Sequence, residues 1–295
     1  MPMIQNTTKY IAGTLAAIAL IIIGTQTTHA AAGDGQQLNV PVGSHASLNW
    51  SGYVAGGNGT ADTYTSVSGS WVVPSVSASA TNSADATWVG IGGVSSRDLV
   101  QAGTQAIVQD GSVTYSAWIE TLPGFSKTVP LAVSSGDSIT ASVTEQSPGS
   151  WLVTLNNNTR GTSYSRTVSY NSSLSSAEWV EEMVSNGNGT FRPLDSFGTV
   201  AFTNAAATVN GTSENLTQLG AQPLQMTNGA RGILATASTI GTDNTSFSVA
   251  RADTSAAAPQ TYAQSYTVVR HHRHAYSGGT YSIVGVPLRF TILRY

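Results

Sequence analysis

The sequence predicts an all-β fold, a sandwich or barrel of short strands. Alternating apolar and polar segments recur along the chain, with Gly-Asp and Pro-Gly turn signals such as Gly136-Asp137 and Pro148-Gly149 between them. In addition, Asp110-Gly111 separates two alternating runs, which is a strong short-range signal for a hairpin. Strands spaced in this way favour an antiparallel sandwich or barrel.

The first residues have the pattern of a secretory signal peptide. Lys9 precedes an apolar run over residues 10–24, and Thr28-His29-Ala30 offers small residues at a cleavage position. The alternative is an uncleaved anchor, but the run is shorter than the ~20 residues of a spanning helix. We therefore expect a signal peptide over 1–31, a short N-terminal or pro-segment over 32–46, and a secreted protein without stable membrane association.

Composition limits the function classes. Only 9% of residues are charged, and the formal net charge is -3. No basic stripe runs through the main body, which argues against a nucleic-acid partner. Cys is absent, so the fold stands without disulfides, and a chain of this length can bury enough surface to do so. We expect one β domain over 47–251, then a linker and a C-terminal β extension over 252–295.

The expected strands follow one another closely. One ambiguous stretch is 175–182, because Ser175 with Glu178 forms a capping box that favours a helix start. Read as a strand, the same stretch places Glu178, Val180 and Glu182 on one face. The other expected strands are 49–54, 66–73, 87–91, the two arms of the hairpin, 127–133, 138–145, 151–156, 162–170, 195–204, 233–238, 246–250, 262–269 and the stretch from 280 onward.

The hairpin places polar groups opposite one another. With Asp110 and Gly111 at the turn, Gln101 faces Glu120 and Gly103 faces Trp118. Val100 and its alternate neighbours form the core face, so Gln101, Trp118 and Glu120 should lie on a wet, polar face.

Several chemistries fit this face. Glu120 with Glu182 would supply the two carboxyl groups of a glycoside hydrolase. Gln101 with a glutamate would serve acyl transfer to water, since the carboxylate can act as general base while the amide holds the developing oxyanion. A non-enzymatic module could use Trp118 as a sugar-binding platform. The residues alone leave these alternatives open.

Other catalytic groups have little support. The sequence lacks a Gly-x-Ser-x-Gly nucleophile elbow. His272 and His274 could share a strand face and bind a metal, but no acidic ligand lies near them in sequence. We expect neither a metal nor a cofactor.

Seven motifs, in order and spacing, resemble the glutamic peptidases, the eqolisin family. The resemblance covers roughly residues 47–250. The motifs are Asn-Trp-Ser-Gly-Tyr (49–53), Ser-Trp-Val-Val-Pro (70–74), Trp-Val-Gly-Ile-Gly-Gly (88–93), Leu-Val-Gln-Ala-Gly (99–103), Tyr-Ser-Ala-Trp-Ile-Glu (115–120), Ala-Glu-Trp-Val-Glu-Glu (177–182) and Phe-Gly-Thr-Val-Ala-Phe-Thr-Asn (197–204).

The resemblance implies a lectin-like (concanavalin-like) β-sandwich of two curved antiparallel sheets. It places the catalytic pair on Gln101 and Glu182, and it favours a strand over a helix at 177–184. It implies a secreted, acid-active endopeptidase that works as a monomer on polypeptide substrates without a cofactor. The residues expected to line or support the cleft are Trp50, Trp88, Gln105, Trp118 and Glu120.

The chain departs from the family pattern at a few places. Gly92 and Gln105 stand where fungal relatives carry Asp, and Glu181 replaces a usually apolar residue. We expect Glu181 either to titrate together with Glu182 or to lie on the opposite face. Residues 253–295 extend past the family domain and carry a His/Arg cluster at 270–274.

Overall fold

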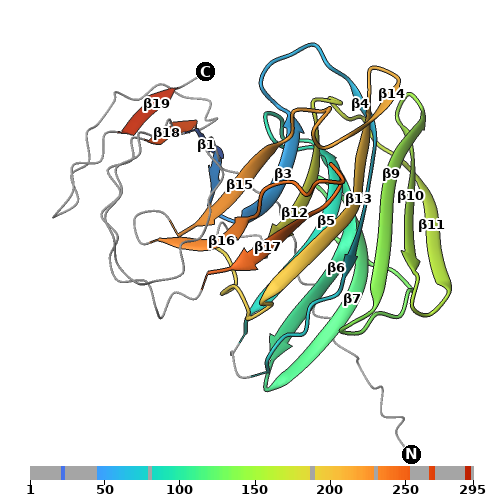
Figure 1. The fold of residues 1–295 in the computed structure, drawn as a ribbon. Coiled ribbons are helices and arrows are strands. Elements are labelled where there is room, and N and C mark those ends of the chain that lie inside the picture. The colour runs from blue at the N-terminus through green and yellow to red at the C-terminus, as the bar shows by residue number, and fades with distance from the viewer. Residues whose placement is uncertain are drawn as a thin grey trace, which may run out of the picture.

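A computed structural model describes residues 45–252, except 79–81, 187–189 and 229–231, and the backbone of three further strands, Ile21–Ile23, Tyr266–Val269 and Phe290–Leu293. Every element in this part of the chain is a strand, and the strands form a curved, two-layered sandwich (Figure 1). The described residues include no helix long and apolar enough to cross a membrane.

The first layer carries the predicted site residues. Neighbouring strands run in the order β8, β7, β6, β5, β12, β3 and β15, all antiparallel, and β2 pairs in parallel with β15. Their bounds are β2 His45–Ser47, β3 Trp50–Gly56, β5 Ala84–Gly92, β6 Leu99–Gln109, β7 Ser112–Thr121, β8 Lys127–Thr128, β12 Ser176–Glu182 and β15 Gln222–Thr227.

The second layer packs against the first (Figure 1). It runs in the order β11, β10, β9, β4, β13 and β17, with β14 on β13, and β16 joins the layers by pairing with both β15 and β17. The bounds are β4 Tyr64–Val72, β9 Ser138–Ser147, β10 Ser150–Asn157, β11 Thr162–Ser169, β13 Thr199–Val209, β14 Thr212–Asn215, β16 Ile233–Ala237 and β17 Phe247–Arg251. In the outer segments, β1 (Ile21–Ile23) pairs with β2 and β18 (Tyr266–Val269), and β18 pairs with β19 (Phe290–Leu293).

The first layer is buried on both faces. The main hydrophobic cluster lies between the layers and includes Trp71, Trp179 and Phe202. A second cluster, which includes Trp50 and Trp88, covers the opposite face of the first layer. Strands β5 and β12 are consequently buried along their whole length, although antiparallel strands often keep one face in water.

The hairpin prediction is confirmed. Asp110 and Gly111 both have positive φ, as a tight two-residue turn requires, and Gln101 pairs with Glu120. The prediction that this polar face is wet was wrong, since Gln101 is 1% and Glu120 3% exposed. The helix signal at Ser175 was overridden too: β12 is a central strand held by β3 and β5, and these long-range pairings outweigh a local capping pattern.

Strand boundaries differ in detail from the predicted ones. The stretch 127–133 pairs only at β8, and the strand expected over 195–204 begins at Thr199 and ends at Val209. Sequence patterns missed β14 and β15, both short and polar at their starts. The His/Arg cluster at 270–274 lies outside the described residues.

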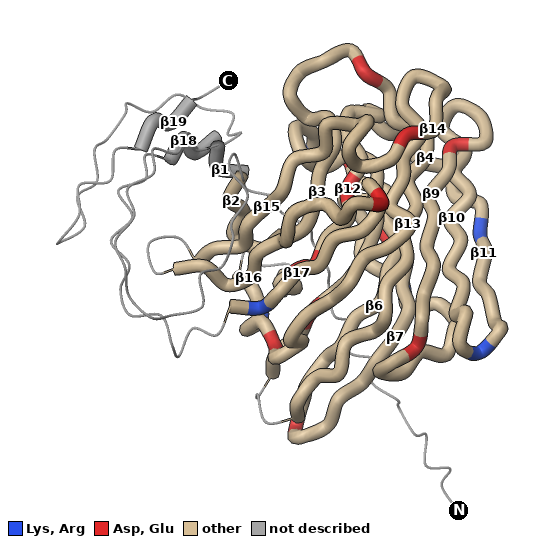
Figure 2. Tube along the Cα trace, in the orientation of Figure 1, with Lys and Arg blue, Asp and Glu red and all other residues tan. Residues whose placement is uncertain are grey.

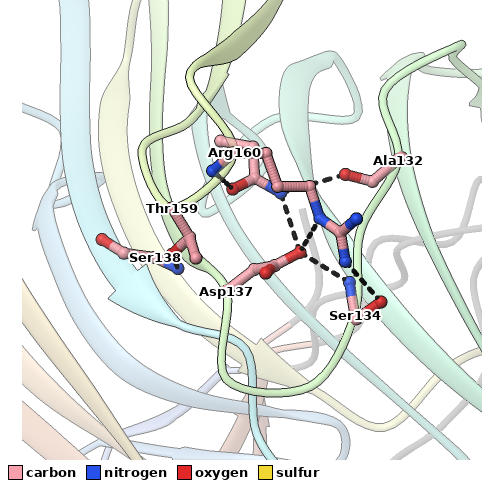
Figure 3. Close-up of polar contacts among 7 residues, drawn as sticks. Ala132, Ser134, Asp137, Ser138, Thr159 and Arg160 are labelled. Atoms are coloured by element: carbon pink, nitrogen blue, oxygen red, sulfur yellow. Dashed lines mark hydrogen bonds and ion pairs between the residues drawn. The ribbon is translucent and has the colours of Figure 1, made fainter.

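Charged residues are sparse along the trace, and the acidic positions are scattered over strands and loops (Figure 2). One acidic residue accepts three hydrogen bonds on a single carboxylate oxygen. Asp137 accepts hydrogen bonds from Ser134 N, Asn157 Nδ2 and Arg160 Nε at 2.7–2.8 Å, which ties the loop before β9 to the β10–β11 turn (Figure 3). We call this arrangement the Asp137 cluster.

Candidate active site

Three rows of side chains cross the face of the first layer that points away from the second layer. The strand registers place Glu182 level with Gln105, Val180 and Trp88 level with Gly103, and Glu178 level with Gln101. The row of Glu178 continues through Gly90 to Gln101 and Glu120, and the row of Trp88 ends at Trp118. Residues from four sequence motifs thus meet on one face.

Glu182 has a donor for each carboxylate oxygen. Asn49 Nδ2 donates to Oε1 at 2.9 Å, and Trp88 Nε1 donates to Oε2 at 2.8 Å. The Trp50 ring packs edge-on against Trp88, with centroids 4.9 Å apart, and so supports the indole that holds the carboxylate. These contacts fix the orientation of Glu182 and stabilise its ionised form.

Gln101 is oriented by Glu120. The amide Nε2 donates to Glu120 Oε2 at 2.6 Å, while Gln101 Oε1 is buried without a partner. Because an amide nitrogen carries two hydrogens, one N–H of Gln101 remains for another acceptor. The side chain therefore keeps one donor and one acceptor free on the face that also carries Glu182.

The two carboxyl groups have separate pKa values. Burial raises the pKa of Glu182 to about 7, while the indoles of Trp88 and Trp50 and the Asn49 amide lower it. Burial and the charge of Glu182 raise the pKa of Glu120 to about 9, although Gln101 opposes this. Glu182 ionises first, and Glu120 stays a neutral acid.

Glycine and tryptophan shape the middle of the face. A Cβ on Gly103 would lie 2.3 Å from Thr87 O and 2.5 Å from Trp88 Cβ, so only glycine allows Trp88 this close approach. Trp118 lies beyond Gly103, fully buried, and its Nε1 has no acceptor. Trp50 is also fully buried with an unpartnered Nε1. The predicted tryptophans therefore lie on one face.

The three family departures have different surroundings. Gln105 donates from Nε2 to Ser116 Oγ at 3.0 Å, within the row of Glu182. Gly92 has φ +92°, and a Cβ there would come within 2.6 Å of Asp98 O, so an L-residue would be strained. Glu181 lies on the opposite face from Glu182, where its Oε2 accepts a hydrogen bond from Thr87 Oγ1 at 2.7 Å.

Sequence reasoning missed one functional contact, that of Asn49. Asn49 is fully buried, and its side-chain amide donates to the Glu182 carboxylate. Its place at the start of the Asn-Trp-Ser-Gly-Tyr motif was the available signal. Within the described residues, no group of three potential ligands could hold a metal ion.

A surface pocket of about 690 Å³ lies beyond the site at the ends of β6 and β7. Asp98 and Leu122 are among its lining residues, and it contains none of the site residues predicted from the sequence. It is therefore not the reaction centre, and its lining also includes two second-layer residues, Gly149 in the β9–β10 turn and Ser169 at the end of β11.

The β-sandwich presents a glutamine, two carboxyl groups and indole donors on one buried face, and groups of this kind suit acid–base hydrolysis. Comparison with known proteins identifies the class further: residues 48–251 match the peptidase A4 family. The chain belongs to this family and is a peptide-bond hydrolase.

Two fungal proteins are similar in sequence. Aspergillopepsin-2 from Aspergillus niger is 33% identical over 202 residues, which cover 60% of this chain and 70% of the relative. Scytalidopepsin B from Scytalidium lignicola is 36% identical over 184 residues, covering 57% of this chain and 66% of the relative. The chain thus spans about two thirds of the length of these relatives.

The fold is shared as well. The crystal structure of scytalido-glutamic peptidase with a peptide-based transition-state analogue matches with a TM-score of 0.59 and 32% identity, over 70% of this chain and 98% of that one. The lectin-like sandwich inferred from the sequence motifs is confirmed by this match.

Proposed function

We propose that this protein is a secreted, acid-active endopeptidase in which Glu182 is the general base and then the general acid, and Gln101 stabilises the oxyanion. The observation that carries the proposal is the pair of donors on Glu182 facing a glutamine with one free N–H. Secretion is supported by the apolar segment at 10–24 and the small residues that follow it.

The mechanism follows from these groups. Ionised Glu182 accepts a proton from water, and that water attacks the carbonyl carbon of the scissile peptide bond. The remaining N–H of Gln101 donates to the carbonyl oxygen as it becomes negative, and Gln101 Oε1 accepts a hydrogen bond from the attacking water. Glu182 then returns the proton to the leaving nitrogen, and the C–N bond breaks.

The supporting residues have separate tasks. Neutral Glu120 orients the Gln101 amide, and Trp88 and Asn49 keep Glu182 in place. Trp50 and Trp118 line the cleft, and their unpartnered N–H groups suit substrate carbonyl oxygens. Because burial dominates the raised pKa of Glu182, entry of solvent and substrate lowers this pKa and ionises the base at acid pH.

Digestion of casein at acid pH tests the proposal. Wild type should cleave it, whereas Gln101→Ala and Glu182→Ala should lose nearly all activity. A glycan hydrolase that used Glu120 and Glu182 would tolerate Gln101→Ala and cleave glycans instead, and a carbohydrate-binding module would show no turnover at all. Equal digestion by all three proteins would contradict the assignment.

A further inference from the structure

Buried polar atoms without partners gather on the site face. A buried polar atom that lacks a hydrogen bond costs about 1–3 kcal/mol, so native proteins contain few of them. An extended peptide would supply the missing partners, because each of its residues brings one N–H and one C=O. The unpartnered atoms on this face are Trp50 Nε1, Gln101 Oε1, Trp118 Nε1, Glu120 Oε1, Ser176 Oγ and both carboxyl oxygens of Glu178.

Glu178 is the one carboxyl group of this face that the mechanism does not use. Alternation along β12 puts it on the same face as Glu182, and no hydrogen bond satisfies either of its oxygens. It is 0% exposed, while Gln101 and Glu182 are each 1% exposed. Whatever opens this face to a substrate for the catalytic pair therefore opens it for Glu178 as well.

The strand register places Glu178 close to the reaction centre. Four residues along β12 separate it from Glu182, about 13 Å, and two strand spacings separate it from Gln101, about 10 Å. Glu178 is thus the third corner of a triangle with the catalytic pair. The midpoint between Gln101 and Glu182 lies about 8 Å from the Glu178 Cα, within reach of its side chain and one or two substrate residues.

The surroundings of Glu178 keep it neutral. Its neighbour on β5 is Gly90, and the side chains of Trp88, Leu99 and Gln101 close over this glycine, so they must shift when a substrate binds between Glu178 and Gln101. Burial raises the pKa of Glu178 well above its ordinary value, the Ser176 hydroxyl opposes this, and the charge of Asp98 adds to it. A neutral carboxyl group offers one donor and one acceptor, which match the C=O and N–H of a peptide.

We propose that Glu178 is a substrate-binding residue that hydrogen-bonds one peptide group of the substrate backbone, about two residues from the scissile bond. This rests on the proposed function. The assignment explains why a buried acid is kept where an apolar residue would be more stable.

Peptides of two lengths test this proposal. One set extends a single residue on each side of the cleaved bond, and the other extends four residues on each side. Glu178→Leu should lower kcat/KM about tenfold on the long peptides, the loss of roughly one hydrogen bond, and leave the short ones nearly unchanged. Glu178→Gln should stay within about threefold of wild type on both sets, because an amide also carries a donor and an acceptor.

Thermal unfolding controls for misfolding. Glu178→Leu should unfold at a temperature equal to or above that of wild type, since it removes an unpartnered buried acid. The proposal is overturned if Glu178→Leu cleaves long peptides like wild type, if it loses activity equally on both lengths, or if Glu178→Gln is as impaired as Glu178→Leu. Failure of the proposed function is distinguished by wild type, which would then cleave neither set.

Discussion

Glu181 and Glu182 are neighbours on β12, but they lie on opposite faces in very different surroundings. Glu182 receives one hydrogen bond on each oxygen, from Asn49 and Trp88. Glu181 receives one, from Thr87, and its Oε1 has no donor. Both are fully buried, so the number of donors, and not burial, separates them.

Glu181 shares the interior with two further acids, Asp85 and Asp195, which together form an acid triad. Asp85 Oδ1 accepts a hydrogen bond from Ala106 N, whereas both oxygens of Asp195 lack a donor. Burial is the main cause that raises the pKa of all three, and Asp85 raises those of Glu181 and Asp195 further. Arg251 is the cation that lowers the pKa of Asp195.

Carboxylate oxygens only accept hydrogen bonds, so contacts within the acid triad require a shared proton. Asp195, with a pKa of about 9, therefore holds its proton at pH values at which Glu182, with a pKa of about 7, ionises. The number of hydrogen-bond donors that reach a buried carboxyl group therefore decides whether it serves as an ionised base or remains a neutral acid.

The largest expected effect is a loss of activity on substitution of Glu182 that substitution of Glu181 does not cause. Glu182→Gln should lower kcat on a peptide at acid pH by about 10²–10⁴-fold, the usual contribution of a general base. Glu181→Gln, the matched variant next to it, should stay within about threefold of wild type, because its side chain faces away from the cleft. Steady-state kinetics measure kcat of both variants, and comparable losses would contradict the different roles of Glu182 and Glu181.

Glu181→Leu should raise the free energy of unfolding at pH 7 by about 1–3 kcal/mol, since an apolar residue replaces a buried acid. Groups with a raised folded-state pKa give stability that is complete below the unfolded pKa near 4 and is lost as pH rises. The stability that Asp85 contributes is lost up to its pKa of about 6. For Glu181 and Asp195 the loss of stability continues to higher pH. Urea unfolding from pH 3 to 8 should show that the free energy of unfolding falls less steeply with pH in Glu181→Leu than in wild type. The same pH dependence in both proteins would contradict the account.

Asn49→Ala tests how one hydrogen-bond donor affects Glu182 on the active face. Removal of one of the two donors should raise the pKa of Glu182 toward the behaviour of the acid triad. We expect kcat/KM to fall about tenfold, the value of one charged hydrogen bond, with the acid limb of its pH profile shifted to higher pH. A lower kcat/KM with an unmoved acid limb would assign Asn49 a purely structural role.

The smallest effect concerns the Asp137 cluster, in which one carboxylate oxygen accepts three hydrogen bonds (Figure 3). Burial would raise the pKa of Asp137, but hydrogen bonds from Arg160, Asn157 and Ser134 outweigh it and lower the pKa. Its stabilisation is therefore present above pH 4 and lost as pH falls through the lowered pKa. Asp137→Asn should cost about 1 kcal/mol at pH 7, because Arg160 is partly exposed, and less at pH 2. Urea unfolding at both pH values measures this, and an equal cost at both would be contrary evidence.

The sequence predicted the parts of the site that local rules control. Asp110-Gly111 determines the hairpin register, and alternation then brings Gln101 to Glu120. The contact of Asn49 with Glu182 joins residues 133 positions apart, and no local pattern encodes the pairing of β3 with β12. Family motifs, and not periodicity, pointed to Glu182 and to a strand there.

The burial of the site face could not be predicted either. Alternation marked Gln101, Trp118 and Glu120 as a polar face, and polar faces usually contact water. The second hydrophobic cluster, in which Trp50 meets Trp88 across β3 and β5, depends on tertiary packing. For the same reason the pKa values of Glu120 and Glu182, set mainly by burial, were inaccessible from the sequence.

The central claim is that Gln101 and Glu182 act as one catalytic unit, and kcat of the two single variants and the double variant tests it most directly. Gln101→Ala should lower kcat by about 10²–10³-fold, as the loss of an oxyanion donor does. Adding Gln101→Ala to Glu182→Gln should then cost little more, since residues that act as a unit are not additive. Wild-type kcat in Gln101→Ala, or full additivity in the double variant, would contradict the account.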